Sequence, residues 1–134
     1  MFRRRSEGRD LSDLFMVLHR DFRELNSVET ARIDRLLAVD FPGRDELAIQ
    51  IQDCWVKSLD ENGSLEIQVR SPIKAASVSG RVPAEGECAD SDGIVIHYLL
   101  HVLDGRVCEL EVDKDDLSAV VNHPPALSIQ VFSY

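Results

Sequence analysis

The segment from Gly93 to Val112 constrains the fold of this 134-residue chain most strongly, because two β-rich runs flank the dipeptide Asp104-Gly105. An Asp-Gly linker of two residues tolerates the positive φ angles of a type I′ turn. A turn of this length also fixes the register of the two strands that it joins. We therefore predict an antiparallel β-hairpin with Asp104 and Gly105 at its tip.

The register of this hairpin follows by counting outward from the turn. One face is then expected to be mostly apolar and the other to carry carboxylates. The apolar face would hold the pairs Leu103–Arg106, His101–Cys108, Leu99–Leu110 and His97–Val112. The other face would place Tyr98 and Leu100 opposite Glu111 and Glu109. The run from 94 to 103 is apolar at nearly every position, which predicts a central strand that is covered on both faces.

The spacing of apolar residues changes along the chain from a helical to an alternating pattern. Helices are expected to begin at Ser12 or Asp13, at Ser27, whose hydroxyl would cap the first turn, and at Arg44. Strands are expected at 55–59, 65–70, 78–88, 94–103, 106–113 and 127–132. Because helices precede strands instead of alternating with them, we predict an α+β fold. Its N-terminal helices would pack on one face of a mainly antiparallel meander sheet of five or six strands.

The domain organisation follows from length and charge pattern. Residues 1–10 are charged and lack periodicity, which predicts a flexible basic arm. Residues 11–134 suffice for one hydrophobic core but not for two ordinary domains, so we expect a single α+β domain. The basic start is not followed by the apolar core of a signal peptide, and no apolar run could cross a membrane. We therefore expect a cytoplasmic protein.

The charge balance limits the classes of partner. The chain has 15 Lys and Arg residues and 24 Asp and Glu residues, which gives a formal net charge of -9. This charge opposes nonspecific binding to nucleic acid or to an anionic membrane, and it favours a basic protein partner. The alternative is that the acidic surface serves solubility alone.

Side chains that could carry chemistry are few. His101 opposite Cys108 would be the closest approach to a nucleophile and its base, but no oxyanion donor or orienting acid accompanies the pair. His97 and His101 are four residues apart, which on a strand places them on one face but well separated along it. A zinc site needs further convergent ligands. We therefore expect no catalytic residues, no metal and no cofactor.

Carboxylates alternate with apolar residues on two of the expected strands, at Glu85, Glu87, Glu109 and Glu111. Asp90 and Asp92 lie on the adjoining turn. Such spacing can present the carboxylates together on one face of a sheet. We predict that these six residues form a partner-binding surface for a cationic protein, and the alternative is a solvated face without a partner.

Three stretches resemble an uncharacterised family of small bacterial cytoplasmic proteins. They are 41–44 (Phe-Pro-Gly-Arg), 60–65 (Asp-Glu-Asn-Gly-Ser-Leu) and a block from Gly93 to Glu111, Gly-x3-His-x-Leu-Leu-His-Val-x-Asp-Gly-x3-Glu-Leu-Glu. The resemblance implies no activity and no catalytic residues. Proteins of this kind are similar in character to the immunity proteins of polymorphic toxin systems, including contact-dependent growth inhibition. The expected function is a non-catalytic immunity protein that neutralises a basic toxin domain such as a nuclease. The alternatives are a domain that binds a small ligand or serves as a structural subunit, and then an enzyme.

Overall fold

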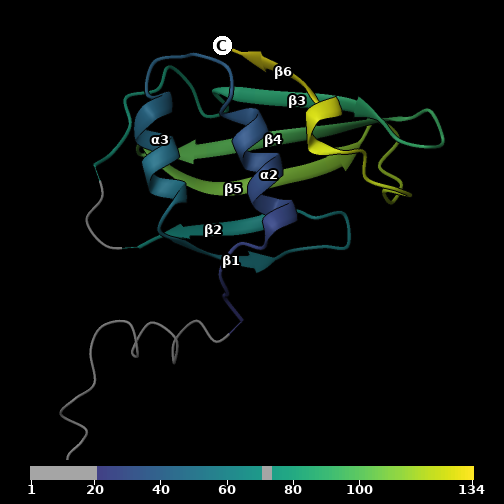
Figure 1. The fold of residues 1–134 in the computed structure, drawn as a ribbon, viewed down its shortest axis with the longest axis horizontal. Helices are drawn as coiled ribbons and strands as arrows, with labels where there is room; N and C mark the ends of the chain where they lie inside the picture. The colour runs from purple at the N-terminus through teal and green to yellow at the C-terminus, as the bar shows by residue number, and fades with distance from the viewer. Residues whose placement is uncertain (1–20, 71–73) are drawn as a thin grey trace, which may run out of the picture.

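A computed structural model describes residues 21–70 and 74–134, which form one antiparallel sheet with two helices on one face (Figure 1). The predicted α+β class is confirmed. The elements are α2 (Ser27–Leu36), α3 (Arg44–Ile51), β1 (Cys54–Ser58), β2 (Leu65–Val69), β3 (Ala84–Ala89), β4 (Val95–Leu103), β5 (Arg106–Lys114), a 3-10 turn η1 (Ala126–Ser128) and β6 (Gln130–Ser133). The expected arm at 1–10 and the expected helix from Ser12 or Asp13 lie outside the described residues.

The six strands are arranged in the order β1-β2-β5-β4-β3-β6. Strands β3, β4 and β5 follow one another as hairpins, while the β1-β2 hairpin joins them through pairing of β2 with β5. Strand β6 returns along the free edge of β3. Strands β4 and β5 are therefore central. No described helix is long and apolar enough to cross a membrane.

The hydrophobic core lies between the sheet and the two helices. Ile33 and Leu36 of α2 and Leu47 of α3 are fully buried, as are Tyr98 and Leu100 on β4. Leu36 of α2 and Ile129 can pack closely against β3 because this strand carries a glycine at position 86. A methyl group at Gly86 would lie 2.5 Å from Ile129 Cγ2 and 2.9 Å from Leu36 Cδ2.

Helix α2 begins at Ser27, as predicted, but Ser27 is not the residue that caps it. Its N-cap is Asn26, not Ser27, so that prediction was wrong. The Asn26 side chain accepts from the Glu29 amide at 2.8 Å, and the Asn26 amide donates to the Glu29 carboxylate at 3.0 Å. This reciprocal capping box satisfies two amides at once, which a serine at position 27 would not do.

Two expected strands begin later than the alternation of their residues indicated. The strand expected at 78–88 begins at Ala84, directly after Pro83, which has no amide proton for a ladder. The strand expected at 127–132 begins at Gln130, because Ala126 to Ser128 form the 3-10 turn. Both differences lie at the starts of the neighbouring strands β3 and β6 and leave the predicted strand number unchanged.

The predicted turn at the tip of the β4-β5 hairpin is confirmed, but the predicted register is wrong beyond it. Asp104 and Gly105 have φ angles of 52° and 76°, as a type I′ turn requires. Leu103 pairs with Arg106 and Val102 with Val107, after which a β-bulge shifts the pairing by one residue. The observed pairs are His101–Glu109, Leu100–Leu110, Leu99–Glu111, Tyr98–Val112 and His97–Asp113.

The bulge decides which side chains share a face of the sheet. Cys108 is the extra residue. Glu109 and Glu111 therefore lie on the same face of the sheet as His97 and His101, and not on the other face. Burial alternates along β4, with every second residue half-buried or exposed. The prediction that this strand is covered on both faces was therefore wrong. Its second face is accessible.

Candidate functional site

The face of the sheet opposite α2 and α3 carries most of the predicted carboxylates. Among the described residues no helix covers this face (Figure 1). We call it the open face and define it by Glu66, Glu85, Glu87, His97, Leu99, His101, Glu109, Glu111 and Asp113. Strand pairing arranges these side chains in three rows: Glu87–His97–Asp113, Glu85–Leu99–Glu111 and His101–Glu109–Glu66. Each row combines acidic residues from at least two strands.

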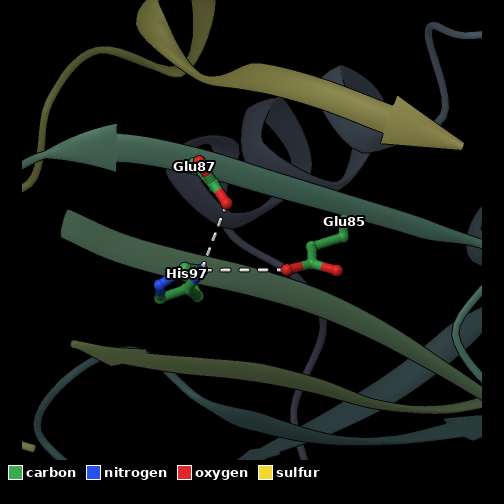
Figure 2. Close-up of side chains that lie close together, drawn as sticks. All are labelled: Glu85, Glu87 and His97. Atoms are coloured by element: carbon green, nitrogen blue, oxygen red, sulfur yellow. Dashed lines mark ion pairs between the residues drawn. The ribbon is translucent and has the colours of Figure 1, made fainter. Parts of the chain in front are cut away.

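Glu85, Glu87 and His97 form a cluster at one end of the open face (Figure 2). The Nδ1 atom of His97 lies 3.7 Å from Glu85 Oε2 and 3.7 Å from Glu87 Oε2. These three atoms all lie within 4.8 Å of one another. Two neighbouring strands position the cluster, since Glu87 pairs directly with His97 and Glu85 precedes it by two residues on β3.

The other ring nitrogen of His97 is used by a residue beyond the end of β5. Nε2 of His97 donates to the carboxylate of Asp115. Burial lowers the pKa of His97. The hydrogen bond to Asp115 and the charges of Asp115, Glu87 and Asp113 together raise it by more, so its pKa lies above the ordinary value. The ring is thus held in one orientation with Nδ1 toward the two glutamates.

His101 has a different set of partners on the same face. Its Nε2 lies 2.8 Å from Glu111 Oε1, and its Nδ1 accepts from Arg81 Nε at 3.4 Å. The hydrogen bond from His101 lowers the pKa of Glu111. Burial raises the pKa of Asp113, and the neighbouring Glu111 raises it further. These two carboxylates of β5 therefore lie close enough to influence each other's pKa.

Cys108 and His101 do not form a nucleophile and base. The thiol of Cys108 donates to the backbone carbonyl of His101 at 3.6 Å, while the His101 ring is bound to Glu111. Burial raises the pKa of Cys108, which opposes thiolate formation. The bulge that separates the two side chains could not be found by counting from the turn.

Asp90 lies away from the open face. It is buried and accepts from Lys114 Nζ at 2.8 Å and from the amides of Val121 and Asn122 at 2.7 and 2.9 Å. Burial alone would raise the pKa of Asp90, but these hydrogen bonds outweigh it and hold the pKa well below the ordinary value. Asp92 lies 2.6 Å from the same ammonium, with a side chain that is 36% exposed.

Sequence reasoning missed Lys114, although a signal was present. Alternation along β5 from Leu110 through Val112 places Lys114 on the buried face, where a lysine requires an acidic partner. The Glu85–Glu87–His97 cluster was missed for another reason. The prediction of no metal rested on the spacing of the two histidines, whereas the cluster arises from the pairing of His97 with the carboxylates of the neighbouring strand.

A groove lies on the helical side of the molecule. It has a volume of about 510 Å³ and is lined by residues of α2, α3 and β1, among them Asp34, Ile51 and Cys54, together with Arg70. Burial raises the pKa of Cys54 to about 11, so this thiol is not a nucleophile at neutral pH. The groove offers space for a small ligand.

Comparison with known proteins gives one match. A family model described as a domain of unknown function (DUF6984) matches residues 22–124. No curated protein and no solved structure matches the chain. The matched range contains both described helices and the first five strands, and with them every residue of the open face.

Proposed function

The chain belongs to the DUF6984 family of domains of unknown function, and we propose that it is a non-catalytic immunity protein. It binds a basic bacterial toxin domain through the open face and blocks that domain's working surface. The observation that carries this proposal is the gathering of six carboxylates from β2, β5 and β3, three of the four neighbouring strands β2-β5-β4-β3, on a sheet face that no described helix covers.

The electrostatics of the open face favour a cationic partner. The whole chain has a formal net charge of -9, and Glu111 and Asp113 lie close enough for the pKa of Asp113 to be raised. Like charges at this density raise the free energy of the isolated protein. A partner's lysine or arginine side chains would relieve the repulsion and accelerate encounter.

Apolar side chains on the same face supply candidate anchors. Leu99 is half-buried between Glu85 and Glu111, and Phe132 on β6 pairs with Glu85 and is 37% exposed. A few such anchors usually provide most of the binding energy, while the surrounding charges set the rate and specificity of association.

The class of toxin follows from charge. A nuclease needs a basic surface to hold the phosphates of its substrate, so it presents the charge that complements the open face. Covering that surface with carboxylates would exclude the nucleic acid. The non-catalytic part of the proposal is supported by the partners of His101 and Cys108, which leave no activated thiol.

Coexpression tests this function. The product of the neighbouring upstream gene is expressed with and without the chain, and growth and copurification are scored. We expect toxicity that the chain relieves, together with a stable complex. The proposal fails if the product is toxic and the chain neither binds it nor restores growth, or if the product is harmless and does not bind.

The groove between α2, α3 and β1 supports a second candidate, which is binding of a small ligand. Its volume of about 510 Å³ falls in the range of known ligand sites. A screen of small molecules by thermal shift, with Arg70→Gln as the groove variant, tests this alternative.

A further inference from the structure

We propose that Glu85, Glu87 and His97 bind one divalent transition-metal ion of the Zn²⁺ class on the open face. The proposal is independent of the immunity function, because it concerns the isolated chain. It replaces the expectation of no metal, which rested on the spacing of the two histidines.

The distances within the cluster fit a shared ion better than direct hydrogen bonds. His97 Nδ1 lies 3.7 Å from an oxygen of Glu85 and 3.7 Å from an oxygen of Glu87, beyond hydrogen-bonding range. Ligands of a tetrahedral zinc ion, at bond lengths of about 2.1 Å, lie about 3.4 Å from one another. A contraction of a few tenths of an ångström would therefore place both contacts at ligand spacing.

Neighbouring groups orient two of the three ligands. The carboxylate of Asp115 can only accept, so Nε2 of His97 carries the proton, and in the neutral ring the lone pair of Nδ1 points toward the glutamates. This is the arrangement in which a carboxylate outside the coordination sphere fixes a metal-binding histidine. The hydroxyl of Tyr134 donates to Glu85 Oε1 at 2.9 Å, which leaves Oε2 directed at the cluster.

A second cluster on the open face has the same residue types but lacks a free ring nitrogen for a metal ion. It consists of His101, Glu109 and Glu111. Arg81 donates to His101 Nδ1, and Nε2 of the same ring donates to Glu111. Both ring nitrogens are thus used, and neither presents a free lone pair. This second cluster is the matched control for the first.

The ligand chemistry selects the class of ion. One imidazole and two carboxylates suit borderline ions such as Zn²⁺ and Co²⁺, whereas Mg²⁺ and Ca²⁺ prefer oxygen ligands alone. Three protein ligands leave a position for water. His97 and Glu85 side chains are 22% and 23% exposed, so an ion could enter from solvent without unfolding of the sheet.

Titration of the full chain with Co²⁺ and Zn²⁺, in reducing buffer after treatment with chelator, tests the proposal. We expect one equivalent to bind, without the absorption band of thiolate ligation. His97→Gln and Glu87→Gln should each weaken affinity by more than the 10–100-fold that loss of an outer partner typically costs. His101→Gln and Glu109→Gln should bind as the wild type does. The proposal would be overturned if no metal bound or if a thiolate band appeared. It would also be overturned if substitutions in the two clusters reduced metal affinity equally.

Asp115→Asn tests the orientation of the ring. Affinity for Zn²⁺ should fall about 10–100-fold, because the proton on Nε2 loses its negatively charged acceptor and keeps at most a neutral amide oxygen. The thermal midpoint of the metal-free protein should stay unchanged, since Asp115 is mostly exposed. The NMR shifts of the His97 ring should report binding in the wild type. A variant with wild-type affinity and unaltered ring shifts would remove Asp115 from the site.

Discussion

The ammonium of Lys114 lies 2.8 Å from the carboxylate of Asp90, and neither side chain is exposed to solvent. This pair joins the end of β5 to the turn after β3. Asp90 also accepts hydrogen bonds from the amides of Val121 and Asn122, so the same carboxylate holds the loop that follows β5. One buried ion pair therefore fixes three segments at one end of the sheet.

Replacement of the lysine tests this role. Lys114→Met leaves the Asp90 carboxylate buried without its cation, and removal of one partner of a buried pair is strongly destabilising. We expect a large decrease in the urea midpoint of unfolding. Lys74→Met, at an exposed position, is the control and should unfold as the wild type does. Equal midpoints for the two variants would contradict the assignment.

Substitution of two glycines distinguishes the cost of backbone strain from the cost of a steric clash. Gly93 and Gly105 both have positive φ angles, of 86° and 76°. Alanine at position 93 meets nothing within 4 Å, so Gly93→Ala should cost only the conformational term of about 1–2 kcal/mol. At Gly105 the new methyl group would lie 2.7 Å from the carbonyl oxygen of Ala76. Gly105→Ala should therefore lower the free energy of unfolding by more, which denaturant titration of both variants measures. An equal loss would show that the contact with Ala76 is relieved at no cost.

Gln50 connects α3 to the hairpin turn. Its fully buried amide donates to the carbonyls of Lys74 and Gly105 and accepts from the Val107 amide at 3.0 Å. Gln50→Leu leaves buried backbone groups without partners, at a cost of about 1–3 kcal/mol each where water cannot enter. Gln52→Leu on the exposed side should change the free energy of unfolding little. A neutral Gln50→Leu variant would show that the connection is dispensable.

His123 should make stability depend on pH. It accepts from the Tyr98 hydroxyl at Nδ1 and donates from Nε2 to the Asn62 carbonyl. Burial and the nearby Arg32 lower its pKa below the ordinary value. As pH falls below about 6.5, the unfolded chain binds a proton at this position that the native state resists, so stability decreases until the native pKa is reached.

The measurement compares free energies of unfolding at pH 7.5 and at pH 5.5. His123→Asn removes the titrating group, and we expect it to lose less stability over this interval than the wild type. The difference between the two proteins isolates His123 from the other histidines. An identical loss in both would mean that His123 titrates alike in the folded and unfolded chains.

The sequence predicts fold class better than register. Alternation and turn residues located the strands, and the positive φ angles of Asp104 and Gly105 confirm the turn. Cys108 then shifts the pairing by one residue, and nothing in its chemistry distinguishes a bulged from a paired position. That single residue moved Glu109 and Glu111 onto the face of the histidines. The predicted acidic residues also divide between two environments, because Asp90 has a buried lysine partner that lies 24 residues away in the sequence.

The most direct test of the open face is the rate of association with the product of the upstream gene, measured by stopped flow in chelator at low ionic strength. Glu87→Lys/Glu109→Lys changes two residues of the open face, and Asp34→Lys/Asp40→Lys makes the same charge change at exposed positions in and after α2. We predict that the open-face variant associates about tenfold or more slowly than wild type, with a weaker salt dependence, and that the control stays close to wild type. Equal rates for the two variants would contradict a docking role for this face.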